Sequence, residues 1–234
     1  MKKSHIATLL VFLVLIPATL FLGTKLSGRS FYITGTLIIL ELMLPFFMAF
    51  EGRRPQAREL VLLAVMCAIA ITGRVALPFP HFKAVFAFVM LSGIVFGPES
   101  GFMVGAITAL ASNFFYGQGA YTPWQMFAYG AGGMLAGFCF DKNRLSRDAL
   151  TMAVFGFFGV VLLIGPLMDC SGLFLMVTTI NTGSVIAVFT AGFPANIANG
   201  ICTALTLLLL GKPMLTKLDR IKVKYGMLGS EPTP

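Results

Sequence analysis

The chain has 234 residues, of which 57% are hydrophobic and only 11% carry a formal charge. Soluble domains contain about 25% charged residues, so this composition excludes an ordinary soluble globule, and the high hydrophobicity excludes intrinsic disorder. Because a membrane-spanning helix takes about 20 residues, the length allows about eight spans and leaves no room for a soluble domain beside them. The net charge of +8 has to be interpreted from where the charges lie along the chain.

Eight apolar runs follow one another along the chain, separated by short polar stretches. Two N-terminal runs cover residues 6–23 and 31–50, and six more cover 60–76, 84–96, 101–116, 123–140, 149–167 and a final stretch ending at Leu210. The run at 84–96 is short for a span, which local thinning of the bilayer or packing inside a bundle can accommodate. The pattern predicts an all-α polytopic membrane helix bundle.

Residues 168–194 are ambiguous, because they are apolar enough for a ninth span but carry polar side chains such as Asp169, Thr178 and Asn181. We interpret them as the outer end of the seventh span, an outside loop and a helical piece leading into the eighth. Irregular backbone of this kind survives at membrane depth only where protein or a water cavity covers it.

The basic residues indicate the orientation. With the N-terminus in the cytoplasm, thirteen of the seventeen Lys and Arg residues fall inside, and Lys25, Arg29, Arg74 and Lys83 fall outside. Inner loops of membrane proteins carry the excess of positive charge. We therefore predict a multi-pass protein of the bacterial plasma membrane with both termini cytoplasmic. Its basic C-terminal tail fits contact with anionic lipid better than contact with nucleic acid.

Motifs of ATP-driven and catalytic membrane proteins are missing. The chain has no GxxxxGK[ST] and no HExxH, and its four cysteines show no CxxC spacing, so we expect no metal site, no cofactor and no enzymatic activity. Only Glu41 is an acidic residue clearly inside a span, where it either has a functional role or pairs with a neighbouring helix or a lipid headgroup. These features indicate a protein that binds a solute and takes its energy from elsewhere.

Polar and aromatic side chains gather in and near three predicted outer connections. This asymmetry predicts an outward-facing pocket for a polar, ring-bearing solute, since ligand sites are apolar cavities with a few placed polar groups. For Tyr121 and Trp124, an aromatic belt at the membrane interface is the alternative. The candidate binding residues are Arg74, His81, Lys83, Asn113, Tyr116, Gln118, Tyr121, Trp124, Gln125, Tyr129, Asp169 and Asn181.

Small residues recur at helical spacing. Ala64 and Ala68 form an AxxxA pattern in the third run, and Gly101 and Gly105 line one face of the fifth. Gly130, Gly133 and Gly137 lie in the sixth run. Such patterns let membrane helices approach closely.

Several of these segments resemble the substrate-binding S components of energy-coupling factor (ECF) vitamin transporters. The most specific matching piece is GQGAYTPWQM at 117–126, and LPFPHFKAV at 77–85, FPANIANG at 193–200 and LDRIKVKYG at 218–226 are similar as well. The resemblance covers about residues 60–226. It implies a six-helix core over 60–226, preceded by an addition of two transmembrane helices in 1–59 and followed by a short tail at 227–234.

The resemblance also implies a function. Substrate is expected to bind from outside under the connections at 77–83, 118–125 and about 169–181. Ala64 and Ala68 are expected to pack against the transmembrane T subunit, and two ATPase subunits are expected to supply the energy. The GQGxxTPWQM and RIKVKYG elements favour a cobalamin-type vitamin, while queuosine, a pyrimidine precursor or another vitamin stay open. A stand-alone facilitator, a regulatory membrane protein and, less favoured, a polytopic membrane enzyme are the alternatives.

Overall fold

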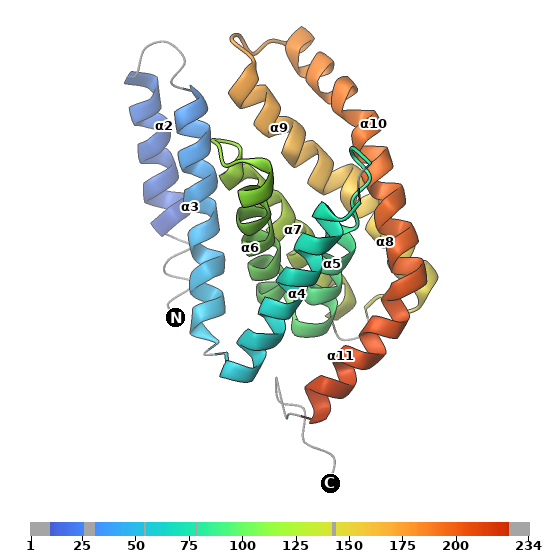
Figure 1. Cartoon of the computed structure of the whole chain (residues 1–234). Helices are drawn as coiled ribbons and strands as arrows, with labels where there is room; N and C mark the ends of the chain where they lie inside the picture. Colours follow the sequence, from blue (N-terminus) through green and yellow to red (C-terminus); the bar gives the residue numbers. More distant parts are fainter. Residues whose placement is uncertain (1–9, 26–30, 54, 78, 142–143, 225–234) are drawn as a thin grey trace.

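The structure is a computed structural model that describes residues 10–25, 31–53, 55–77, 79–141 and 144–224. These residues form eight helical rods and contain no strand (Figure 1), which confirms the predicted all-α membrane bundle. Lys2, Lys3, Arg29, Arg54, Lys142, the tail at 227–234 and both ends of the chain lie outside the described residues.

The rods coincide with the eight predicted runs. An N-terminal hairpin consists of η1 (Val11–Leu15) continued by α2 (Ile16–Lys25), and of α3 (Phe31–Gly52). Four central helices follow: α4 (Ala57–Val75), α5 (Val85–Phe96), α6 (Pro98–Tyr116) and α7 (Thr122–Phe140). The last two rods are continuous composites, α8 (Ala149–Gly159), η3 (Val160–Ile164) and α9 (Gly165–Met176), and then α10 (Thr182–Thr206), η4 (Leu207–Gly211) and α11 (Lys212–Lys224).

The ambiguous segment at 168–194 resolves into two helices and a short connection. α9 continues to Met176, residues 177–181 form the connection, and α10 begins at Thr182. This confirms the predicted extension of the seventh span, the loop and the helix leading into the eighth, without a ninth span. The basic segment after Leu210 is helical up to Lys224, so α11 extends the last span instead of forming a separate tail.

The sharp turns between the central helices depend on glycine. Gly97 lies between α5 and α6 with φ of +93°, and Gly117 ends α6 with φ of +96°. L-residues with a side chain rarely adopt this region, whereas glycine enters it without a steric penalty. Pro98 occupies the first turn of α6, where a helix has no use for its missing N–H.

Side-chain caps begin the two long rods. The Asp148 carboxylate accepts a hydrogen bond from the backbone N–H of Thr151, and Asn181 forms a reciprocal capping box with Ser184. Hydrogen bonds to Asp148, first from the Ser146 side chain and then from Thr151, hold the pKa of this carboxyl below its usual value. Asn181, a candidate binding residue, therefore has a structural task at the start of α10.

α5 lies at the centre of the bundle, and all twelve of its residues are buried. Glycine backbones form its contacts: a Cβ added to Gly93 would overlap the carbonyl oxygen of Gly133, and one added to Gly101 would lie 2.5 Å from the same oxygen. The small-residue faces predicted in the fifth and sixth runs therefore do lie at helix–helix contacts, between α5, α6 and α7. Absent side chains are what allow such close helix approach.

The helices differ greatly in length. Three of the described helices, at Ile33–Gly52, Ala149–Met176 and Thr182–Lys224, are long and apolar enough to cross a membrane by length and composition. The last has 43 residues, which at 1.5 Å per residue rise about 65 Å, twice the hydrocarbon thickness of about 30 Å. It must therefore extend beyond the hydrocarbon region, whereas α5 with 12 residues is too short to cross it.

Most of the described basic residues lie at one end of the bundle, which we call the basic end, whereas Lys25, Arg74 and Lys83 lie at the other. The connections 76–84, 117–121 and 177–181 form this opposite, loop end (Figure 1). At the basic end, three cationic side chains donate to the last carbonyl oxygens of α5. Arg147 donates to Ile94 at 3.2 Å, Lys222 to Val95 at 3.0 Å and Arg53 to Phe96 at 3.4 Å. Cations near a helix C-terminus satisfy its free carbonyls and its dipole. These three charges therefore also hold the last turn of α5.

The N-terminal hairpin packs against α6, α7 and α9 through α3. The ring of Phe46 lies 4.5 Å from that of Phe102 on α6, centroid to centroid. Glu41 accepts a hydrogen bond from the hydroxyl of Thr19 on α2. Glu41 therefore does pair with a neighbouring helix, α2 of the same hairpin, which was one of the two predicted alternatives.

Candidate functional site

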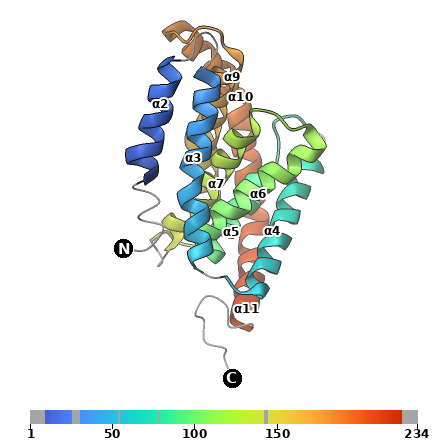
Figure 2. The same cartoon turned by 90° about the vertical axis from the view of Figure 1, so that its left-hand side faces the viewer.

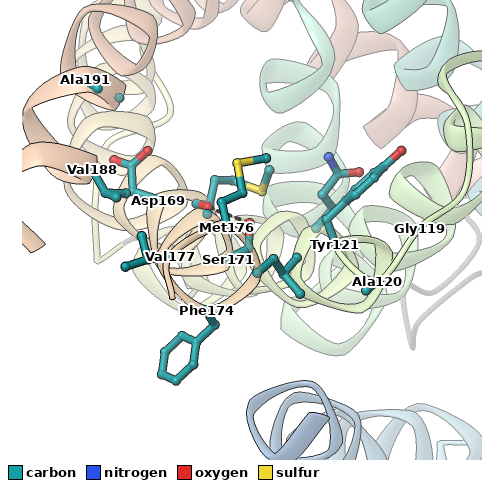
Figure 3. A pocket seen from close by; sticks show the side chains of 15 residues that line it. Gly119, Ala120, Tyr121, Asp169, Ser171, Phe174, Met176, Val177, Val188 and Ala191 are labelled. Atoms are coloured by element: carbon teal, nitrogen blue, oxygen red, sulfur yellow. Dashed lines mark hydrogen bonds between the residues drawn. The ribbon is translucent and has the colours of Figure 1, made fainter. Parts of the chain in front are cut away.

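A cavity of about 950 Å³ opens at the loop end, between the start of α7, the outer half of α9 and the outer half of α10. Figure 3 shows Asp169 and Val188 on one side and Tyr121 on the other, while Phe174 points away from these side chains. Its lining is mostly apolar, and this is the usual character of a small-molecule site. The residues that line it are Gly119, Ala120, Tyr121, Gln125, Met168, Asp169, Ser171, Gly172, Phe174, Leu175, Met176, Val177, Val188, Ala191 and Gly192.

Three of the candidate binding residues line this cavity: Tyr121, Gln125 and Asp169. Asp169 accepts a hydrogen bond from Asn196 Nδ2 through Oδ2 at 2.8 Å. Its other oxygen lies against α10 at Gly192, where a Cβ would overlap it. The carboxylate is thus held between α9 and α10 and still borders the cavity.

Gln125 belongs to a hydrogen-bond network that extends behind the cavity wall. Its Oε1 accepts from Asn113 Nδ2 at 2.8 Å, and Asn113 also donates to Thr122 Oγ1 at 3.1 Å. Asn113 is fully buried on α6, and its Oδ1 accepts from Arg74 Nη1 at 2.9 Å. Arg74 and Asn113 therefore lie behind Gln125 and do not line the cavity.

Aromatic rings surround the guanidinium of Arg74. It lies over the rings of Tyr116 and Tyr129, 4.9 and 5.5 Å from their centroids. The Tyr116 hydroxyl donates to the Arg74 carbonyl oxygen at 2.9 Å, and Tyr129 is buried against Phe86. Gln118 is bonded locally, accepting from Thr122 Oγ1 at 3.0 Å. These candidates support the wall of the cavity from behind.

Trp124 occupies the side of α7 that faces α3. Its ring stacks on Phe174 with centroids 5.2 Å apart, and the side chain is 6% exposed. A Cβ at Gly35 of α3 would lie 3.2 Å from Phe174 and 3.3 Å from Trp124. The N-terminal hairpin thus covers the outer faces of both cavity walls, and Trp124 packs in this contact and not at an exposed membrane interface.

The remaining candidates lie elsewhere at the loop end. His81 is exposed, with φ of +56°, and Lys83 donates from Nζ to the Leu77 carbonyl oxygen at 2.5 Å and from its backbone N–H to Asn199 at 3.3 Å. Asn181 caps α10. None of the three lines the cavity.

Sequence reasoning missed the apolar walls from α9 and α10, including Met168, Met176, Val188 and Gly192. The sequence prediction was based on polar side chains, whereas most of the surface of a ligand cavity is apolar. One available signal was the proline at 194, two residues after Gly192, because a proline inside a helix marks a bend. Among the described residues, no three His, Cys, Asp or Glu side chains gather as they would around a metal ion.

The chain matches one family model over most of its length. The family model for the ECF-type riboflavin transporter S component matches residues 55–216. The chain belongs to this family. The match begins between α3 and α4 of this S component, so its N-terminal hairpin lies outside the matched residues.

A UPF0397 protein of Vibrio atlanticus (strain LGP32) is 32% identical to this S component over 117 residues, covering 47% of this chain. The matched part spans 64% of that protein, less than two thirds of its length. No solved structure matches the S component.

Proposed function

We propose that this chain is the substrate-capture subunit of an ECF-type importer in the bacterial plasma membrane, binding a vitamin from the outside without chemical conversion. The observation that carries the proposal is the cavity of about 950 Å³ at the loop end, apolar except for a few placed polar groups. Family membership supports it, and so does the distribution of charge, since the loop end lies opposite the basic end.

For the vitamin itself we propose riboflavin or a ring system of its size. The matching family model is named for riboflavin, and cavities of about 300–1,000 Å³ hold ligands of that size. Cobalamin, which the sequence favoured, is a much larger molecule; it stays a prediction and is the competing ligand in the test.

We propose that the outward face of α4 binds the T subunit of the importer, which carries two ATPase subunits. Ala64 and Ala68 are exposed on this helix, so a partner helix can approach them closely. The N-terminal hairpin packs on α6, α7 and α9. In Figure 2, α6 lies between this hairpin and α4. The hairpin therefore leaves this face of α4 open.

The test is to purify the full chain in detergent and measure binding of riboflavin and cobalamin, alone and in competition. We expect saturable riboflavin binding and co-purification with a T subunit and ATPases when these are co-expressed. Uptake by this chain alone, undiminished when the ATPases are inactivated, would favour a stand-alone facilitator. Binding of neither vitamin would contradict the substrate class.

A further inference from the structure

The hydrogen-bond network behind the cavity has a defined direction. It begins at Arg74 in the last turn of α4, passes through Asn113 on α6 and ends at Gln125 on α7, where the amide borders the cavity. Asn113 is fully buried and Gln125 is 9% exposed. Water therefore does not compete for the inner members of this chain of bonds.

The direction follows from the chemistry of the three side chains. A guanidinium can only donate hydrogen bonds, whereas each amide has an accepting oxygen and a donating nitrogen. Asn113 must therefore turn Oδ1 toward Arg74, and its Nδ2 then faces Gln125. The oxygen of Gln125 is occupied by this bond, and its Nε2 donates to no protein group among the described residues.

Arg74 is held firmly enough to impose this direction. Besides Asn113, its Nη1 donates to Ser112 Oγ, and its guanidinium contacts the faces of two tyrosine rings. Cation–π contacts of this kind help to hold a guanidinium that, like that of Arg74, is only half-buried. A different orientation of Asn113 would place its NH₂ group against a guanidinium that has no acceptor.

The opposite side of the cavity has the reverse polarity. The carboxylate of Asp169 on α9 only accepts hydrogen bonds when ionised. One of its oxygens is occupied by Asn196. The cavity thus presents a donor from α7 and an acceptor from α9.

We propose that Arg74 and Asn113 are positioning residues that fix Gln125 as a hydrogen-bond donor to an acceptor atom of the substrate, opposite the accepting carboxylate of Asp169. This inference rests on the proposed function and deepens it. The cavity selects a ring with a carbonyl group on one side and hydroxyl or N–H groups on the other. Riboflavin, with ring carbonyls and a polyol chain, carries both.

Asn113→Asp is the decisive variant, because residue 113 does not line the cavity. An aspartate still accepts from Arg74, but it can only accept from Gln125. The Gln125 amide then has to rotate, so that Nε2 faces residue 113 and Oε1 faces the cavity. Gln125 Oε1 would then face the acceptor atom of the substrate, so that one hydrogen bond is lost and two acceptors oppose each other. We expect riboflavin affinity to fall about 5- to 150-fold.

A double-mutant cycle separates positioning from a general loss of structure. In a Gln125→Ala background, Asn113→Asp has no amide to rotate, so it should change riboflavin affinity little. In the ligand-free protein, the side-chain amide NMR signal of Gln125 should shift in Asn113→Asp, and this readout needs no substrate. Should Asn113→Asp not fold, Arg74→Gln, which can donate or accept, should weaken binding more than Arg74→Lys, which still only donates.

The possible results distinguish three claims: the positioning role, the contact between Gln125 and substrate, and the proposed function. Wild-type affinity in Asn113→Asp together with an unshifted Gln125 signal would overturn the positioning role. Unchanged affinity in Gln125→Ala would overturn the contact between Gln125 and substrate, while the proposed function would stand. If the wild type binds neither riboflavin nor cobalamin, the proposed vitamin binding fails, and the amide signal still decides whether Arg74 and Asn113 orient Gln125.

Discussion

The centre of the bundle and the outer arm of α10 are built in opposite ways. All residues of α5 are buried, and it meets α7 through glycine backbones, whereas no residue of α10 from 182 to 195 is buried. Pro194 lies inside α10 at the boundary between this uncovered arm and the packed remainder, where its missing N–H interrupts the helix hydrogen bonds.

The cavity lies between α7, which packs on α5, and the less buried α9–α10 side, so its two walls differ in how tightly they are packed. Gln125 stands on α7, which the glycine contacts hold in place, and Tyr121 lies directly before this helix. Asp169 and Val188 stand on the α9–α10 side, which has few buried contacts of its own. Segments with few buried contacts open at a lower free energy than packed cores. We infer that the α7 wall holds its polar group in a fixed position and that the α10 wall adapts to the ligand.

The largest expected effect comes from breaking the packed region. In Gly133→Ala, the new Cβ would overlap the carbonyl oxygen of Gly101, so α6 and α7 must separate. We expect the free energy of unfolding to fall by about 3 kcal/mol or more, measured by thermal or denaturant unfolding in detergent.

The matched control for Gly133→Ala is Gly172→Ala on α9. A Cβ there meets only Val188 Cγ1, at 3.8 Å. This variant should be neutral or gain up to about 1 kcal/mol, because alanine is the better helix former. Equal losses of unfolding free energy in Gly133→Ala and Gly172→Ala would contradict the contrast between the two regions.

The second prediction separates the proposed T-subunit surface from the cavity. Ala64→Trp or Ala68→Trp should abolish co-purification with the T subunit, because bulk on α4 prevents close helix approach, and should leave vitamin affinity unchanged. Leu162→Trp, at a position 69% exposed on another helix, is the control. Wild-type transport in both Ala64→Trp and Ala68→Trp would refute a docking role for this face of α4.

The third prediction concerns the adaptable wall. Asp169→Asn keeps the shape of the side chain and an acceptor for Asn196, but it removes the charge that faces the cavity. Riboflavin affinity should fall about tenfold to a hundredfold with unfolding unaffected, as measured by equilibrium binding. Unaltered affinity would assign Asp169 to structure alone.

A smaller effect on binding than that of Asp169→Asn is expected from a change in the N-terminal hairpin. Gly35→Leu would press on Phe174 and Trp124, the outer faces of both walls, and should lower the free energy of unfolding by about 1–3 kcal/mol. Its effect on affinity should be smaller than that of Asp169→Asn, since the ring of Phe174 that α3 contacts points away from the other labelled lining side chains (Figure 3). Gly52→Leu, where a Cβ meets nothing within 4 Å, is the control. An affinity loss without a loss of stability would mean that the hairpin takes part in binding.

Helix positions followed well from the sequence, whereas the site followed only in part. The apolar runs predicted each rod, although the capped start of α10 at Thr182 and its unbroken extension to Lys224 were less clear. Among the candidate residues, Tyr121, Gln125 and Asp169 do line one cavity. Trp124 is one position from Gln125 yet faces α3, because adjacent residues on a helix point about 100° apart.

Hydrophobic length, charge asymmetry and small-residue spacing are local properties, and the bilayer or a neighbouring helix responds to them directly. From them alone came the all-α membrane bundle, the basic end and the small-residue faces of α6 and α7. The function of each polar group depended on which helices approach it. Arg74 and Asn113 resemble ligand contacts in sequence, but they lie behind Gln125, because α4, α6 and α7 bring three distant side chains into one directed chain of hydrogen bonds.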